Sequence, residues 1–156
     1  MEPRVVVIGF GNSLRGDDAL GPRVADELRR QIADPRVEVI SETALGVDLA
    51  ASLAVATLAV FLDAALDGPP GGVVCRTLRP AEDTPAAAAH HLTPEELLGV
   101  TRTLYRRVPQ ACLLSVRGAV FDWADNELST QVAAAVEPMI VRARTLIGEH
   151  LTPSAT

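Results

Sequence analysis

The apolar positions of the chain recur with two different periods, and together they predict alternating strands and helices. Val5–Ile8 is an uninterrupted apolar run, which is typical of a parallel strand that is buried on both faces. Leu20, Val24 and Leu28 follow at four-residue spacing. We therefore expect an amphipathic helix over residues 18–32, with its apolar face on the sheet.

The later segments continue this alternation. Further strands are predicted at residues 37–41, 57–62, 73–78 and 111–116, and further helices at 44–53, from 93 onward and at 129–150. Thr93 begins a capping box, with proline at the next position and Glu96 three residues later. The Gly- and Pro-rich turn at 67–72, between the third and fourth predicted strands, predicts a local antiparallel pair at one edge of the sheet.

This order of elements predicts an α/β fold, a three-layer α/β/α sandwich. Its centre is a five-stranded, mostly parallel twisted sheet with one antiparallel edge strand. Hydrophobic residues make up 48% of the chain but aromatic residues only 3%, which favours helices packed on an aliphatic sheet. No repeat or linker interrupts the pattern, so we expect one domain over residues 1–150 and a frayed tail at 151–156.

Charge and hydropathy exclude several classes of function. The net charge of -6 disfavours nucleic acid as a partner, because phosphate binding needs a basic face. The longest apolar stretch, residues 45–66, contains Asp48 and Asp63 and does not predict a membrane span. The N-terminus has no signal-peptide pattern. We expect a cytoplasmic protein, and the composition fits a monomer.

The two cysteines, Cys75 and Cys112, form no CxxC pair and lie within apolar segments. This placement is typical of buried, reduced thiols and gives no sign of a reactive nucleophile. No disulfide framework is implied.

Candidate chemistry begins just after the first strand. Gly9, Gly11 and Asn12 form a turn, and Asp17 and Asp18 follow at the entrance of the predicted helix. One aspartate is enough to cap a helix, so the second is open to a metal or substrate contact.

Asp63 and two histidines complete the candidate set. Asp63 closes the predicted third strand, at the sheet edge where α/β proteins bind ligands. His90 and His91 lie in the loop before the third predicted helix, where they are either simply exposed or directed at the carboxylates. Two carboxylates and an imidazole suit a divalent ion such as nickel or zinc, and three protein ligands leave positions open.

Other catalytic and binding patterns fit less well. Leu14 stands where the dinucleotide fingerprint Gly-x-Gly-x-x-Gly requires its third glycine, which disfavours a nucleotide-binding regulatory domain. Gly-x-Ser-x-Gly and His-Glu-x-x-His patterns are absent from the sequence.

The run Gly-Phe-Gly-Asn-Ser-Leu-Arg-Gly-Asp-Asp-Ala-Leu-Gly at residues 9–21 resembles the [NiFe]-hydrogenase maturation proteases. Members of this family are cytoplasmic endopeptidases that remove the C-terminal extension of the hydrogenase large subunit. The resemblance implies that Asp18, Asp63 and His90 are metal ligands and catalytic residues. His91 is the alternative to His90, which the His-x-Leu spacing favours.

The same resemblance implies a partner and a cofactor. The partner is the large-subunit precursor, and the nickel is carried by that substrate, with no tightly bound cofactor in the protease. Asp17 would act as a base or only as a cap. Residues 115–123 depart from the family pattern, which affects substrate choice more than reaction type. The main alternative is a non-catalytic metal-binding or chaperone module on the same scaffold.

Overall fold

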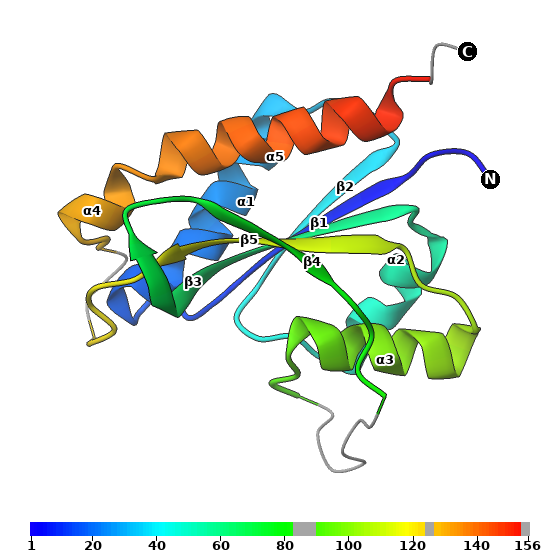
Figure 1. Ribbon diagram of the computed structural model, residues 1–156, viewed down its shortest axis with the longest axis horizontal. Coiled ribbons are helices and arrows are strands. Elements are labelled where there is room, and N and C mark those ends of the chain that lie inside the picture. Colours follow the sequence, from blue (N-terminus) through cyan, green and yellow to red (C-terminus); the bar gives the residue numbers. More distant parts are fainter. Residues whose placement is uncertain (83–89, 124–126, 154–156) are drawn as a thin grey trace.

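The computed structural model describes residues 1–82, 90–123 and 127–153. A single five-stranded sheet with the order β2-β1-β3-β5-β4 lies between two layers of helices (Figure 1). The three-layer α/β architecture predicted from the sequence is therefore confirmed, including its mostly parallel sheet and one antiparallel edge strand.

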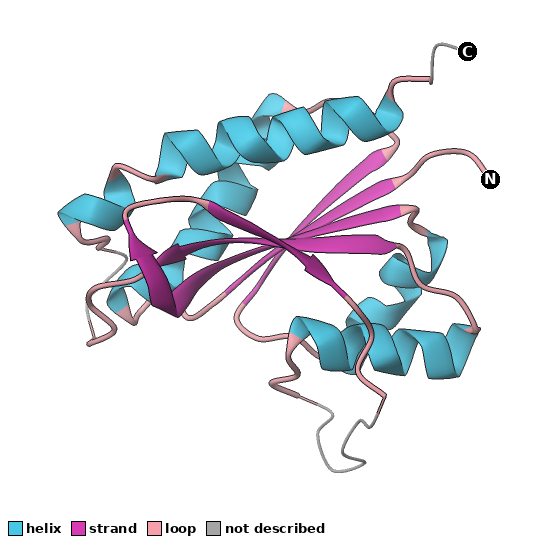
Figure 2. Ribbon diagram, in the orientation of Figure 1, coloured by secondary structure: helices cyan, strands magenta, loops and turns pink. Residues whose placement is uncertain are grey.

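The strands alternate with the helices along most of the chain (Figure 2). The strands are β1 (Val5–Phe10), β2 (Val37–Glu42), β3 (Leu58–Pro70), β4 (Val74–Leu78) and β5 (Gln110–Arg117). The α-helices are α1 (Leu20–Gln31), α2 (Ala50–Val55), α3 (Pro94–Tyr105), α4 (Thr130–Ala133) and α5 (Val136–Leu151), and short 3-10 helices precede α1 (η1, Gly16–Ala19) and α2 (η2, Val47–Leu49). The capping box predicted at Thr93 is present at the start of α3.

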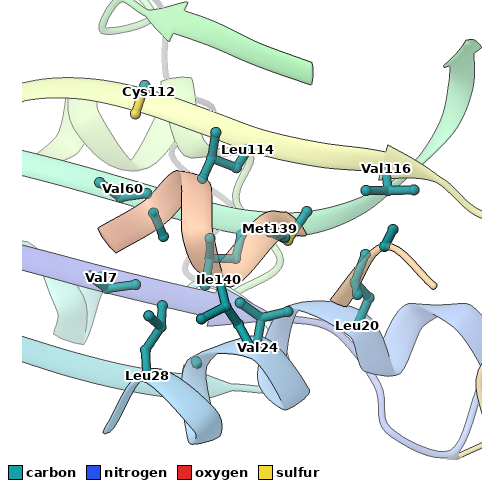
Figure 3. Close-up of a cluster of buried hydrophobic side chains, with 14 of the residues drawn as sticks. Val7, Leu20, Val24, Leu28, Val60, Cys112, Leu114, Val116, Met139 and Ile140 are labelled. Carbon is teal, nitrogen blue, oxygen red and sulfur yellow. The ribbon is translucent and has the colours of Figure 1, made fainter. Parts of the chain in front are cut away.

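Each face of the sheet has its own apolar core. Helices α1 and α5 cover one face, and their aliphatic side chains meet those of the sheet (Figure 3). Helices α2 and α3 cover the other face, where Phe61 and Ile8 are fully buried. Residues alternate between the two cores along β1, β3 and β5, because successive side chains of a strand point to opposite faces.

The direction of the chain reverses at β1, and this reversal fixes where a site can form. Helix α1 leads from β1 to β2 on one side, whereas α2 leads from β2 back across β1 to β3 on the other side. The two connecting helices therefore cover opposite faces, and a crevice opens between the carboxyl ends of β1 and β3. Ligands bind at such switch points in open α/β sheets.

Three details differ from the sequence predictions. Strand β3 does not end near residue 62 but continues to Pro70, because β5 offers pairing partners as far as Arg117. Strand β4 pairs with β5 and not with β3. The reason is that Pro70, at the end of β3, lies opposite Arg117 at the end of β5, so the chain turns back along β5. The final helix is divided into α4 and α5, because Pro138 can neither donate to the carbonyl of Ala134 nor fit beside it.

The two cysteines also differ from each other. Cys112 is buried as predicted, but Cys75 is exposed. The reason is that Cys75 lies on the edge strand β4, whose first four residues are all exposed. Within the described residues, no helix is both long and apolar enough to cross a membrane.

Candidate active site

Glycines bring helix α1 unusually close to the ends of β1 and β3. A Cβ on Gly9 would collide with the backbone carbonyl of Gly21, and a Cβ on Gly21 would collide with the carbonyls of Phe10 and Leu62. Only residues without side chains permit this approach. The start of α1 and the two carboxylates before it are thereby held at the carboxyl edge of the sheet.

The turn between β1 and α1 positions Asp18. Gly11 has a φ of +145°, and a side chain there would collide with the carbonyl of Asp18. The backbone N–H of Asn12 donates to Oδ2 of Asp18 at 2.6 Å, and Oδ1 of Asn12 accepts from the N–H of Leu14 at 2.9 Å. Asp18 is half-buried, and its carboxylate is fixed by the turn that the sequence motif encodes.

Asp63 lies one residue beyond the last pair between β1 and β3, which joins Gly9 and Leu62. Burial and, to a smaller extent, the negative charge of Asp18 together raise the pKa of Asp63 to about 7, against the lowering effect of the Ala64 N–H. The influence of Asp18 on this pKa places the two carboxylates within electrostatic reach of each other. Asp63 is therefore partly protonated at neutral pH.

Both carboxylates and one imidazole line a cavity of about 210 Å³. The lining residues are Phe10, Gly11, Asp18, Thr43, Ala44, Leu45, Asp63, His91 and Leu92. His91 is held there by its left-handed backbone, with a φ of 61°, and by the N–H of Leu92, which donates to the carbonyl of Leu45 at 3.0 Å. The structure thus brings together side chains from three segments that are far apart in the sequence.

The structure distinguishes the two neighbouring histidines by position. Both imidazoles are exposed, but only His91 is among the residues that line the cavity. Which of them binds a metal stays a prediction. In the parts of the chain that the structure describes, no three Asp, Glu, His or Cys side chains are grouped closely enough to hold a metal ion. The imidazole therefore lines the same cavity as the carboxylates without completing a ligand shell.

Asp17 has a different environment from Asp18. Its side chain is fully buried and accepts hydrogen bonds from the N–H groups of Ala119 (2.7 Å), Val120 (2.9 Å) and Ser129 (2.7 Å), and from the Ser129 hydroxyl (2.9 Å). Burial acts to raise the pKa of Asp17, but these four hydrogen bonds outweigh it and leave the pKa below its usual value. Asp17 joins η1 to the segment between β5 and α4.

This connection is the part of the region that sequence reasoning missed. The pattern of Asp17 and Ser129 gives no signal, because 112 residues separate the two. The only hint is local, since Ser129 is a typical N-cap residue and its hydroxyl also accepts from the N–H of Val132.

The fold and the site together define a class: a three-layer α/β protein with paired carboxylates at the switch point of a mostly parallel sheet. Solved structures of the same architecture cover almost the whole chain. The hydrogenase maturating endopeptidase HybD from E. coli is 24% identical, covers 94% of this chain and 93% of its own, and superposes with a TM-score of 0.75. The hydrogenase 2 maturation peptidase from a Thaumarchaeota archaeon is 27% identical over 96% and 99%, with a TM-score of 0.70.

A third match is the [NiFe] hydrogenase maturation protease HycI from Thermococcus kodakarensis. It is 24% identical, covers 96% of this chain and 93% of its own, and has a TM-score of 0.67. No protein-family model matches the chain, and no curated protein matches it. The resemblance predicted from the glycine turn is thus confirmed at the level of the fold, which this chain shares with hydrogenase maturation endopeptidases.

Proposed function

We propose that the chain is an endopeptidase that removes the C-terminal extension of a nickel-loaded [NiFe]-hydrogenase large-subunit precursor in the cytoplasm. The observation that carries this proposal is the convergence of Asp18, Asp63 and His91 on one cavity at the switch point of the sheet. Support comes from the shared fold, because the matched structures are named as hydrogenase maturation endopeptidases.

In this proposal the three side chains bind the nickel that the precursor carries. Carboxylate oxygens and an imidazole nitrogen are suitable ligands for a divalent ion of this kind. In this proposal the metal arrives with the substrate, so the free enzyme needs only part of a ligand shell, and the side chains around the cavity would supply that part. A precursor without nickel would lack the group that the site recognises.

The metal also supplies the chemistry of cleavage. A bound divalent ion polarises a nearby carbonyl or activates a water molecule. Asp63, whose pKa is about 7 in the metal-free protein, would release its proton when it binds the nickel, because a metal-bound carboxylate is deprotonated. Asp17 is assigned no such role, since its two oxygens already accept four hydrogen bonds.

The test is to incubate the protein with its nickel-loaded precursor and to weigh the product by mass spectrometry. His91→Ala and His90→Ala are a matched pair, because they remove the same side chain from adjacent positions. We expect His91→Ala to slow processing about 100-fold or more, with His90→Ala close to the parent.

Each outcome has a clear meaning. The reverse ranking would return the ligand role to His90. Equal activity of both variants would remove the imidazole from the mechanism. If the protein binds nickel or the loaded precursor but the precursor mass never changes, the chain is a metal-binding or chaperone module and not a protease.

A further inference from the structure

We propose that Cys75 and Cys112 form a thiol pair that reacts with low-molecular-weight disulfides and closes into a disulfide between β4 and β5. This proposal is independent of the proposed function. It concerns a modification site on the α1 and α5 side of the sheet, away from the cavity that Asp18 and Asp63 line.

The register of the two strands places the cysteines next to each other. Cys75 is opposite Leu114, and Cys112 is opposite Thr77. Cys75 and Thr77 are two residues apart and point to the same face, so the two cysteines occupy diagonal positions on one face. Diagonal Cα atoms in an antiparallel pair are about 7–8 Å apart, slightly more than the upper limit of about 7 Å for a disulfide.

Strand β4 can make the small movement that closure needs. It is the last strand of the sheet and is hydrogen-bonded to β5 alone. The two thiols already interact, and this contact adds to the effect of burial in raising the pKa of Cys112 to about 12. The buried partner is also held in place, because Cys112 belongs to the apolar cluster beneath α5 (Figure 3).

The different exposure of the two thiols sets the order of the reaction. Exposed Cys75 reacts first: its sulfur attacks one sulfur of the reagent, the reagent's S–S bond breaks, and one thiol leaves. Buried Cys112 then gives up its proton and attacks the Cys75 sulfur of this mixed disulfide, and the second thiol leaves; the raised pKa of Cys112 makes this the slow step. The reagent disulfide is reduced to two thiols, the cysteine pair is oxidised, and the two cysteine protons end on the released thiols.

The test uses the folded, reduced protein and oxidised glutathione as the reagent. We expect the parent to lose the mass of two hydrogen atoms and a peptide map to show residues 75 and 112 joined. Dithiothreitol should reverse both changes. The oxidised protein should also melt at a higher temperature, because the cross-link restricts the unfolded chain.

Three variants separate pairing from simple thiol reactivity. Cys112→Ala should stop at the mixed disulfide and keep one glutathionyl group, and Cys75→Ser should stay unmodified while folded. The matched control is Cys75→Ser with Arg76→Cys, which moves the thiol to the next residue on the same strand. That residue is opposite Leu113 and faces α3, where Arg76 forms an ion pair with Glu95 at 3.0 Å.

The control should form no disulfide with Cys112. The proposal is overturned if the parent stops at the mixed disulfide, if it gives only cross-linked dimers, or if it does not react. It is also overturned if the control closes as readily as the parent, because a thiol on the opposite face would then reach Cys112 only through unfolding. Circular dichroism checks that each variant is folded before the reagent is added.

Discussion

The carboxylate of Asp17 and the carboxylate pair of Asp18 and Asp63 differ in how many hydrogen-bond donors of the protein surround them. Asp17, with its four hydrogen-bond donors, forms a locked carboxylate, and its pKa lies below the usual value. Asp18 and Asp63 form an open pair that lines a cavity, and burial together with mutual repulsion raises the pKa of Asp63 to about 7. Neighbouring aspartates in the sequence thus have different surroundings, because four donors of the protein surround Asp17 whereas Asp18 lines a cavity.

This contrast has a physical basis. A buried carboxylate is stable when enough donors surround it, and its removal then leaves those donors without partners. Two carboxylates that face one cavity repel each other, and this repulsion lowers the stability of the folded protein. Natural proteins accept such a loss of stability at functional sites. The locked carboxylate should therefore govern the stability of the protein, and the open pair its activity.

The largest effect is expected for Asp18→Asn, which tests the open pair through activity. The amide keeps the shape of the side chain and an oxygen to accept from the N–H of Asn12, so the fold should persist. Processing of the nickel-loaded precursor should fall about a hundredfold to a thousandfold, because a charged ligand is lost. Mass spectrometry of timed samples gives the rate. Full activity in a folded Asp18→Asn variant would contradict the role of the open pair.

The next largest effect is expected for Asp17→Ala, which tests the locked carboxylate through stability. Three backbone N–H groups and one hydroxyl lose their acceptor within a buried region. Unfolding in urea should show a loss of about 3 kcal/mol or more. A loss near zero would show that water replaces the carboxylate and that the two regions do not differ as described.

A third prediction uses the pH dependence of Asp63. Its pKa of about 7 in the folded protein exceeds the ordinary value of 3.8. The folded state therefore holds a proton that the unfolded state releases, and stability falls as the pH rises from about 4 through about 7. Asp63→Asn removes this loss, so it should be more stable than the parent by up to about 4 kcal/mol at a pH of about 8, the full value of a pKa shift from 3.8 to about 7.

The same variant should equal the parent in stability at a pH of about 4, where Asp63 is protonated in the folded state. Urea unfolding at the two pH values measures the difference. A constant difference at all pH values would show that Asp63 is not the group responsible. Asp17 gives the opposite sign, because a lowered pKa contributes stability that is lost as the pH falls.

The smallest effect is expected for Ser129→Ala. This change removes one of the four donors to Asp17 and the cap on the N–H of Val132, while the backbone N–H of Ser129 still reaches the carboxylate. The loss should be about 1 kcal/mol, measured by thermal unfolding. A loss as large as that of Asp17→Ala would mean that the hydroxyl, and not the whole set of donors, holds the segment.

Much of this organisation could be predicted because it is local in the sequence. The period of Leu20, Val24 and Leu28 predicts α1, and the capping box at Thr93 predicts the start of α3, since both depend on neighbours within a few residues. The glycine turn also predicts the place of Asp18, because Gly11 permits a backbone that other residues resist.

The remainder depends on contacts between distant residues. The pairing of β4 with β5 could not be predicted from the Gly- and Pro-rich turn. The turn indicates that the chain reverses, but it does not indicate which strand pairs with β4. The choice between His90 and His91 as the cavity residue depends on the left-handed backbone of His91, which no local pattern signals. The donors to Asp17 come from more than one hundred residues away.

That long-range bond has a consequence for how the protein is made. The N-terminal half of the chain leaves the ribosome first. The carboxylate of Asp17 then lacks the hydrogen bonds that stabilise its charge until Ser129 has been made. Strand β4 waits as well, since β5 must emerge and insert before β4 has a neighbour. The nascent chain therefore completes the surroundings of Asp17 only after residue 129 has emerged, and a chain cut before that residue should lack the donors that hold η1.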